Sequence, residues 1–330
     1  MGVKVLSLFD GMACGMIAFK QLGIEVDEYH AYEIDKYTIQ VSKHNFPEII
    51  HHGDVFEGNF TEYRNFDYLI GGSPCTYWSI AQFADRRETV ASGMGWELFS
   101  QYVRALHEAK PKYFLYENNK SMSNEIYKSI SETFGFEPIM INSALVSAQN
   151  RQRYYWVGKR NLDGSYSKVD IKQPEDRGIL LRDVIDGMTD REKGRAIIGS
   201  TGRTTHREYF KKSQGNMVYE PVVKPRFHAI HVEFENKIPI KAISETDGKT
   251  YSVYCVADGK ITIKGQNYPV KLVDGYYIIR KLTVNECKRL QTVPDWFEFP
   301  VSDTQAYKCL GNGWTVEVIV YLLRNTLEAL

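Results

Sequence analysis

The sequence predicts an α/β fold with a doubly wound parallel sheet. In the first half of the chain, short runs of β-branched and aromatic residues alternate with segments of helical periodicity, which is typical of βαβ units. After Asn161 the composition of the sequence changes: turns rich in Gly, Asp and Lys come first, and hairpin-like strands follow. The sequence therefore predicts one large α/β domain and a smaller β-containing domain.

The elements of the large domain can be assigned in order from the N-terminus. Its strands are expected at residues 3–9, 29–34, 68–70, 113–116, 139–141 and 153–157, with helices at 15–22 and 36–45. In the second part, hairpin-like strands are expected at 261–263 and 276–279, before helices at 284–291 and 315–330. We therefore predict a first domain at 1–161, a second at 162–275, and a C-terminal segment at 276–330 that returns to the first.

Length and composition fit this organisation. A chain of 330 residues with 43% hydrophobic and 25% charged residues can form one large core and a smaller one. Lys and Arg number 41, as do Asp and Glu, so the overall charge does not indicate a nucleic-acid partner. Between Arg191 and Arg226, however, nine basic residues meet three acidic ones. That stretch predicts either a phosphate-binding patch or an ordinary solvated face.

The cysteines and the apolar runs indicate the cellular environment. Five cysteines, an odd number with no metal-binding spacing, are typical of reduced thiols in an intracellular protein, and we expect no metal. The N-terminus has no signal-peptide pattern, and no apolar run approaches the ~20 residues needed to cross a bilayer. We expect a cytoplasmic protein, or a nuclear one in a eukaryote, without a membrane segment.

One thiol and one carboxylate follow two of the predicted strands. Cys75 ends the motif Gly71-Gly72-Ser73-Pro74-Cys75 after the strand at 68–70, and Glu117 follows the strand at 113–116. The carboxyl ends of parallel strands meet at the edge where α/β sheets bind ligands. A nucleophile and an acid at this edge suit attack on an electron-poor ring. Alone, a cysteine after a strand is more often a small buried hydrophobe.

The turn after the first strand predicts a site for a nucleotide-containing cofactor. In Phe9-Asp10-Gly11-Met12-Ala13-Cys14-Gly15 the glycines would let a ligand approach the backbone. Ala13 interrupts the Gly-x-Gly-x-x-Gly fingerprint, which disfavours NAD. Glu33 ends the second strand, where an acid commonly binds ribose hydroxyls, and Asp54 could accept a hydrogen bond from an adenine amine.

Three donors follow one another in Gln149-Asn150-Arg151-Gln152-Arg153. In a strand, Gln149, Arg151 and Arg153 would share one face and converge on one site. The alternative is a solvated cationic strand edge.

Taken together, these motifs resemble those of the cytosine carbon-5 methyltransferases. Ser73-Pro74-Cys75, Glu117-Asn118, the Gln-x-Arg-x-Arg motif, and the run from Arg280 to Gly313 occur in the family's order. These motifs are most similar to those of vertebrate de novo DNA methyltransferases and their bacterial or phage relatives. The resemblance covers 3–158 and 280–323. It implies a Rossmann-like S-adenosylmethionine-dependent methyltransferase sheet in 1–161 and a target-recognition domain in 162–275.

The resemblance also implies residue roles. Cys75 would be the nucleophile and Glu117 the acid that holds the cytosine, with Arg151 and Arg153 completing the catalytic set and Arg151 supporting Glu117. The S-adenosylmethionine site would comprise Phe9, Asp10, Gly11, Gly15, Glu33, Ile34, Asp54, Val55, Pro74, Asn312 and Trp314. DNA or the flipped base would contact Ser79, Gln82, Asn118, Gln149, Arg203 and Arg207.

The expected reaction is methylation of carbon 5 of cytosine within a short sequence of duplex DNA, after the base is flipped out. The segment 74–94 would close over the base, with a hinge at 92–95. Departures at Met12-Ala13-Cys14 and Asn119 remove no catalytic atom. Two alternatives remain: an RNA (tRNA) cytosine carbon-5 methyltransferase, whose Cys-Phe-Thr signature is absent, and a silent DNA-binding scaffold, against which the retained catalytic residues argue. A cognate restriction enzyme is a possible partner, while the target sequence and oligomeric state stay open.

Overall fold

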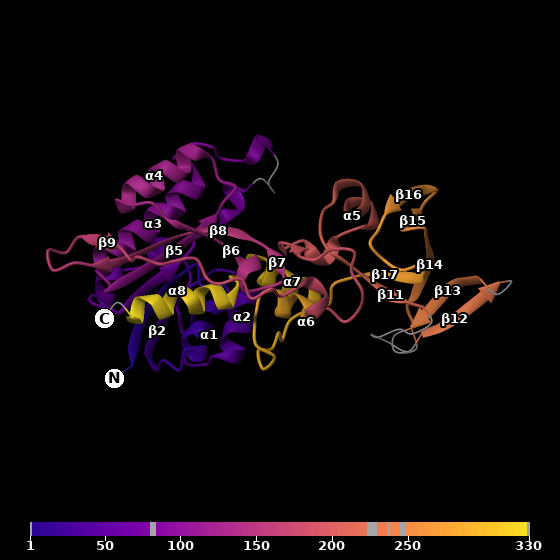
Figure 1. The fold of residues 1–330 in the computed structure, drawn as a ribbon. Helices are drawn as coiled ribbons and strands as arrows, with labels where there is room; N and C mark the ends of the chain where they lie inside the picture. The colour runs from indigo at the N-terminus through magenta and orange to yellow at the C-terminus, as the bar shows by residue number, and fades with distance from the viewer. Residues whose placement is uncertain (1, 80–83, 223–229, 236–237, 245–247, 329–330) are drawn as a thin grey trace.

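The computed structural model describes residues 2–79, 84–222, 230–235, 238–244 and 248–328. A larger α/β lobe and a smaller, β-rich lobe lie at opposite ends of the molecule (Figure 1). The two chain termini lie near each other at the far end of the larger lobe. The α/β class and the presence of a smaller β-containing part are thus confirmed.

The larger lobe is built on one sheet with the strand order β3-β2-β1-β4-β5-β8-β6. Its strands are β1 (Val3–Leu8), β2 (Val26–Tyr32), β3 (Ile50–His51), β4 (Tyr68–Gly71), β5 (Tyr113–Asn119), β6 (Ile139–Asn142), β8 (Gln152–Arg160) and β9 (Tyr166–Lys168), which pairs with β8. The first five strands in the order are parallel, as predicted.

The prediction of a wholly parallel sheet is wrong for β8. This strand runs antiparallel to β5, β6 and β9. The connection from β6 to β8 holds only the short turn η5 (Ser143–Leu145) and the two-residue strand β7 (Gln149–Asn150). Because a parallel crossover needs a dozen or more residues, usually including a helix, this short connection returns the chain antiparallel.

Helices cover both faces of the sheet. On one face lie α1 (Cys14–Gln21), α2 (Lys36–Asn45) and α8 (Val316–Glu328), and on the other α3 (Met94–Ala109) and α4 (Asn124–Phe134) (Figure 1). In α8, Val316, Ile319 and Leu323 are fully buried at helical spacing, so the C-terminal helix contributes to the core beside α1. The C-terminal helix thus packs within the larger lobe.

The smaller lobe contains an antiparallel sheet with the order β11-β17-β14-β13-β12. Its strands are β11 (Met217–Pro221), β12 (Ile230–Glu235), β13 (Ile238–Ser244), β14 (Thr250–Ala257) and β17 (Gly275–Lys281), with the hairpin β15 (Lys260–Ile263) and β16 (Gln266–Pro269) attached to β14. β15 and β17 confirm the strands expected at 261–263 and 276–279. Hydrogen bonding places β9 in the large sheet and all of β17 in the small one, so both lie across the predicted boundaries.

The remaining elements are short. They are η1 (Val55–Glu57), η2 (Phe60–Tyr63), η3 (Cys75–Tyr77), η4 (Ala84–Arg86), η6 (Leu181–Asp183), β10 (Gly194–Arg195), η7 (Thr201–Arg203), α5 (His206–Lys212), α6 (Val284–Leu290) and α7 (Asp303–Asn312). β10 pairs with β7, which places the chain around residue 195 beside the end of β8. Among the helices described, none is long and apolar enough to cross a membrane.

A buried ionic cluster joins the small sheet to the C-terminal segment. Arg280 on β17 pairs with Glu220 on β11 and, through two nitrogens at 2.8 and 2.9 Å, with Glu286 on α6. Glu286 also accepts from the backbone N–H of Thr283, completing a capping box at the start of α6. The cluster therefore links β11 and β17 of the smaller lobe to α6 of the C-terminal segment, at the joint between the two lobes.

Candidate active site

A cleft opens at the carboxyl ends of β1, β2, β4 and β5, and segments from both halves of the chain line it. Of the residues singled out from the sequence, it brings together Phe9, Asp10, Gly11, Glu33, Pro74, Cys75, Glu117, Arg151, Arg153, Asn312 and Trp314. The edge predicted from strand order is therefore where these side chains meet.

Cys75 begins the turn η3, and Gly72-Ser73-Pro74 link this turn to the end of β4. Its carbonyl accepts hydrogen bonds from the backbone N–H groups of Trp78 and Ser79 at 3.1 and 2.9 Å. Burial raises the pKa of the Cys75 thiol, whereas the positive charge of Arg153 opposes this rise. The thiol is thus protonated in the free protein at neutral pH, and forming the thiolate requires removal of a proton.

Gly72 allows the cysteine turn to lie against Glu117. A Cβ at Gly72 would lie 2.6 Å from the Glu117 carbonyl oxygen and 3.0 Å from Oε2 of its carboxylate. A larger residue could not occupy this position without displacing the acid.

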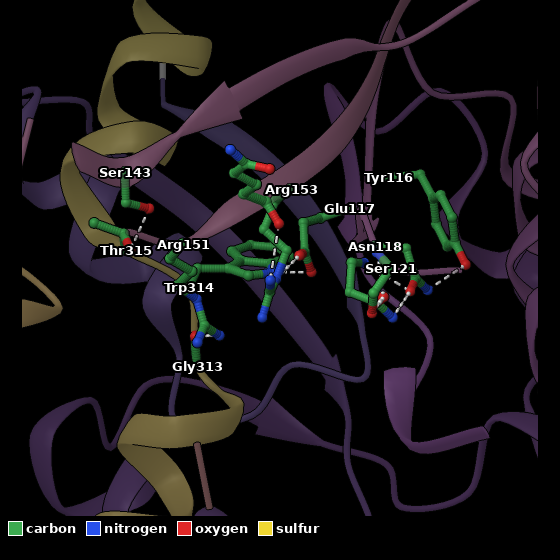
Figure 2. Close-up of polar contacts among 12 residues, drawn as sticks. Tyr116, Glu117, Asn118, Ser121, Ser143, Arg151, Arg153, Gly313, Trp314 and Thr315 are labelled. Carbon is green, nitrogen blue, oxygen red and sulfur yellow. Dashed lines mark hydrogen bonds and ion pairs between the residues drawn. The ribbon is translucent and has the colours of Figure 1, made fainter. Parts of the chain in front are cut away.

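Two side chains donate to the Glu117 carboxylate, one to each oxygen. Arg153 Nε lies 3.0 Å from Oε1, and Trp314 Nε1 donates to Oε2 at 3.0 Å, as Figure 2 shows. The Arg153 and Glu117 side chains are only 16% and 13% exposed, so the ion pair is largely shielded from water. The carboxylate is therefore held in one orientation at the wall of the cleft.

Arg151 does not make the expected contact with Glu117. Its guanidinium donates to the carbonyl of Ile197 at 2.8 Å and to those of Gly311 and Gly313 at 3.1 and 2.9 Å. The reason is that the strand is interrupted at Arg151, between β7 and β8, so the alternation of Gln149, Arg151 and Arg153 on one face fails. Burial, with a contribution from Arg153, lowers the pKa of Arg151 to about 10, which leaves it charged at neutral pH.

The family model for C-5 cytosine-specific DNA methylase matches residues 3–328. The chain belongs to this family. It is 28% identical over 99% of its length to the type II methyltransferase M1.ScrFI of Lactococcus lactis subsp. cremoris, covering 78% of that protein. It is also 34% identical over 48% of its length to the orphan methyltransferase M.Rho11sI of Bacillus phage rho11s, covering 33% of that protein.

Solved structures agree on the fold. Entamoeba histolytica methyltransferase EhMeth matches with a TM-score of 0.59 at 15% identity, covering 100% of this chain and 99% of that one. Schizosaccharomyces pombe Dnmt2 methyltransferase matches with a TM-score of 0.56 at 17% identity, over 99% of each chain. The family expected from the motifs, and the activity of a DNA cytosine-5 methyltransferase, are confirmed.

Asp10 is the least satisfied charged group of the methylase cleft. Its Oδ1 accepts from Ser7 Oγ at 2.6 Å and from Tyr29 OH at 2.7 Å. Its Oδ2 is buried and has no hydrogen-bond partner within the described part of the chain. Burial raises the pKa of Asp10 to about 6. A buried carboxylate oxygen of this kind favours a ligand that brings a positive charge.

Glu33 organises the neighbouring turn. Its Oε2 accepts from the backbone N–H of Gly11 at 3.0 Å, and its Oε1 accepts from those of Ile34 and Asp35 at 2.9 Å each. Glu33 therefore joins the ends of β1 and β2. Ile34, beside it, exposes 74% of its side chain, an unusual exposure for this residue type.

Four residues predicted for the cofactor site do not line the cleft: Gly15, Ile34, Asp54 and Val55. A Cβ at Gly15 would lie 2.2 Å from Ile70 Cδ1, so this glycine permits close packing of α1 on the sheet. Asp54 accepts from the backbone N–H of Phe56 at 3.0 Å and caps η1, and Val55 is buried.

Two predicted DNA contacts are buried inside the protein. Gln149 donates to the Leu290 carbonyl and to Gln291 Oε1, both at 2.7 Å, and so fastens β7 to the C-terminal segment. Asn118 donates to the Ser73 carbonyl at 3.2 Å and, as Figure 2 shows, to Tyr116 OH at 3.1 Å. As described, neither side chain faces DNA, because the amides serve as internal hydrogen-bond partners.

The segment that was expected to close over the base is described in part. Ser79 follows η3, while Gln82 lies outside the described residues. Glu88 accepts from Trp78 Nε1 at 3.2 Å and from the backbone N–H of Gly95 at 3.0 Å, linking the cysteine turn to the start of α3. Closure of this segment stays a prediction.

The basic stretch of the smaller lobe divides into two groups. Arg203 on η7 and Arg207 on α5 are exposed, as the prediction of DNA contacts requires. Arg191 donates to the Gly215 carbonyl at 2.9 Å and Lys193 to those of Ala144 and Ser147 at 2.6 and 3.1 Å, so these two serve the fold. Lys224 and Arg226 lie outside the described residues.

Sequence reasoning missed the part played by Gln291. This buried side chain donates to the Leu310 and Gly313 carbonyls at 2.6 and 3.0 Å and accepts from Thr315 Oγ1 at 2.9 Å. It thereby holds the turn between α7 and α8, which carries Trp314. Its place in the run from Arg280 to Gly313, which resembles the family's C-terminal motifs, was the available signal. No metal-binding group of three or more His, Cys, Asp or Glu occurs among the residues described.

Proposed function

We propose that this methylase transfers a methyl group from S-adenosylmethionine to carbon 5 of a cytosine flipped out of duplex DNA, with Cys75 as the nucleophile. The observation that carries the proposal is the packing of the Cys75 turn against Glu117, whose two oxygens are held by donors at the wall of one cleft. Thiol and acid thus come from neighbouring strand ends, as addition to a ring requires.

The residues of the cleft fit the cofactor. The unpartnered Oδ2 of Asp10 suits a cationic group, and S-adenosylmethionine carries an ammonium and a sulfonium. The exposed Ile34, beside the turn that Glu33 organises, offers an apolar surface close to the same strand ends for the adenosine part. When bound, S-adenosylmethionine supplies an electrophilic methyl group. Phe9, Pro74, Asn312 and Trp314 would complete the walls around it.

Cys75 overcomes the poor nucleophilicity of carbon 5. Its thiolate forms a bond to carbon 6, and the electrons of the 5,6 double bond make carbon 5 reactive. Burial favours the thiol, so its proton must pass to solvent water as the base binds, and Arg153 stabilises the thiolate that results. After methylation, loss of the carbon-5 proton restores the double bond and expels the thiolate.

Glu117 holds the base during this step. One carboxylate oxygen accepts from the 4-amino group, and the protonated acid donates to ring nitrogen 3, which draws electrons away from carbon 6 and favours the addition. Arg153 keeps the carboxylate in place through its 3.0 Å ion pair. Because carbon 6 is inaccessible in a stacked duplex, the base must first leave the helix, at a cost of a few kcal/mol.

Target recognition is assigned to residues 162–275, with Arg203 and Arg207 as phosphate or base contacts. The relatives include enzymes named type II and others named orphan, so a cognate restriction enzyme is an open partner. Bisulfite mapping of DNA from a host that expresses the protein would identify the methylated sequence. Absence of a nuclease gene beside the methylase gene, in a host that survives, would identify an orphan enzyme.

The direct test is trapping with 5-fluorocytosine. Fluorine at carbon 5 blocks the final elimination, so genomic or randomised duplex DNA containing it, given with S-adenosylmethionine, should yield a denaturant-stable protein–DNA adduct. The adduct should disappear in Cys75→Ser while cofactor binding persists. Trapping on fluorinated RNA alone would support an RNA substrate, and cofactor binding without any trapping would support a silent scaffold.

A further inference from the structure

The two donors to Glu117 differ in charge. Arg153 Nε at Oε1 is cationic, whereas the Trp314 indole N–H at Oε2 is neutral (Figure 2). We propose that Trp314 is a positioning residue for the reaction, because its N–H fixes the carboxylate of Glu117 in the orientation that meets the cytosine edge. The proposal rests on the function proposed above, in which Glu117 holds the base.

The indole is carried by a fixed turn. The Gly313 carbonyl accepts from Arg151 Nη2 at 2.9 Å and from Gln291 Nε2 at 3.0 Å, and the Trp314 carbonyl accepts from Cys14 Sγ at 3.8 Å. Thr315, the next residue, is bonded to Ser143 Oγ at 2.8 Å (Figure 2). Donors thus hold the backbone at 313–315, from which the indole reaches Glu117.

A neutral donor suits this place. Glu117 has to accept a hydrogen bond from the 4-amino group and also to carry a proton toward ring nitrogen 3. A second cation beside Arg153 would favour the ionised form and oppose that proton. An indole N–H orients Oε2 without adding charge, and each oxygen, which has two lone pairs, keeps one for the base.

The same contacts give Arg151 an indirect role in holding Glu117, although its guanidinium does not make the expected contact with that carboxylate. Its guanidinium holds the carbonyls of Ile197, Gly311 and Gly313 and so supports the turn beneath the indole. Arg151 therefore acts on Glu117 through Trp314, while Arg153 acts on it directly. Both arginines of the motif serve one carboxylate by different routes.

The test removes the N–H and keeps the ring. Trp314→Phe, and a matched protein in which Trp314 is replaced by 3-benzothienylalanine, whose sulfur takes the place of the N–H, should lose turnover at saturating DNA and cofactor by roughly 10- to 100-fold, the value of one hydrogen bond to a charged group. In the benzothienylalanine protein, which keeps the ring as a wall of the cofactor site, the dissociation constant for S-adenosylmethionine should change by less than about threefold. Because the thienyl analogue keeps the shape of tryptophan, it answers the question even if the phenylalanine variant folds poorly.

Two controls isolate the contact. Trp296 is exposed, and Lys20 Nζ lies 4.3 Å from the centroid of its ring; its change to Phe should leave turnover unaltered. In a Glu117→Ala background, the Trp314→Phe change should alter the rate of 5-fluorocytosine adduct formation by less than about twofold, since its target is gone.

Turnover that stays at the wild-type level at saturation, with a raised KM for S-adenosylmethionine, would overturn the proposal and leave Trp314 as a wall of the cofactor site. An equal loss with and without the Glu117 carboxylate would overturn it too. If the wild-type protein forms no fluorocytosine adduct, the proposed function itself has failed, whatever the Trp314 variants do.

Discussion

Two arginine–glutamate groups, one in the cleft and one at the joint between the lobes, differ in exposure and in completeness. At the joint, Arg280 is 6% exposed and its partners Glu220 and Glu286 are fully buried, with the guanidinium divided between the two carboxylates. In the cleft, Arg153 and Glu117 keep 16% and 13% exposure. The buried cluster is closed by protein donors, whereas the cleft pair leaves an accessible edge for a ligand. The first therefore serves the fold and the second the chemistry.

The largest expected effect belongs to the cleft pair. Glu117→Gln removes the proton that the mechanism donates to ring nitrogen 3, and should lower turnover by about 10²- to 10⁴-fold with little change in thermal stability. Steady-state methylation of DNA with labelled S-adenosylmethionine measures this loss, and thermal unfolding checks the fold. A large loss of stability would show instead that Glu117, like the Arg280 cluster at the joint, stabilises the fold.

The joint should show the reverse pattern. Arg280→Met leaves two buried carboxylates without their cation and should cost about 3–5 kcal/mol in the free energy of unfolding. Denaturant unfolding at pH 8 measures it. The matched control is Arg289→Met, which breaks a 2.5 Å pair with Asp186 whose side chains are 36% and 43% exposed, and which should cost at most about 1 kcal/mol. Similar costs for the two variants would remove the distinction between buried and exposed pairs.

Asp10 sharpens the comparison because it is a carboxylate of the cleft without a cation. Burial raises its pKa to about 6, so the ionised form that would pair with a cationic cofactor is lost as the pH falls through that value. Affinity for S-adenosylmethionine should be nearly constant above pH 7 and weaken by up to about tenfold per pH unit below 6. Calorimetric titration between pH 5 and 8 measures the trend. In Asp10→Asn the binding should be weaker and this dependence absent; an unchanged slope would assign it to another group.

The smallest effects are expected on the surface of the small lobe. If Arg203 and Arg207 contact phosphates, each change to Ala should weaken DNA binding uniformly across sequences and reduce the slope of log K against log salt by about 1. If either reads a guanine, discrimination should fall instead by about 1–3 kcal/mol. Fluorescence anisotropy at several salt concentrations separates the two. No change in either quantity would move the recognition surface elsewhere.

The sequence by itself determined where the cleft lies. Cys75 and Glu117 follow the runs at 68–70 and 113–116 that the sequence predicts as buried strands. Parallel strands bring their carboxyl ends to one edge, so local pattern was enough to predict that both residues line it. The same rule predicted Phe9, Asp10 and Glu33 at the first two strand ends. It could not exclude β8 as a parallel strand, because direction depends on the short connection from β6 and on its pairing partners.

Only the tertiary structure decided which groups touch. Gln149 and Arg151 were expected to act from one strand face with Arg153, but the strand is broken at Arg151. Gln149 is buried against the C-terminal segment, and Arg151 still lines the cleft while its guanidinium donates to backbone carbonyls. The Trp314 contact with Glu117 joins residues 197 positions apart. Short motifs specify turns and strand ends through local backbone geometry, whereas the partner of a buried donor is set by how distant segments pack, since each buried polar group must be satisfied by whatever lies beside it.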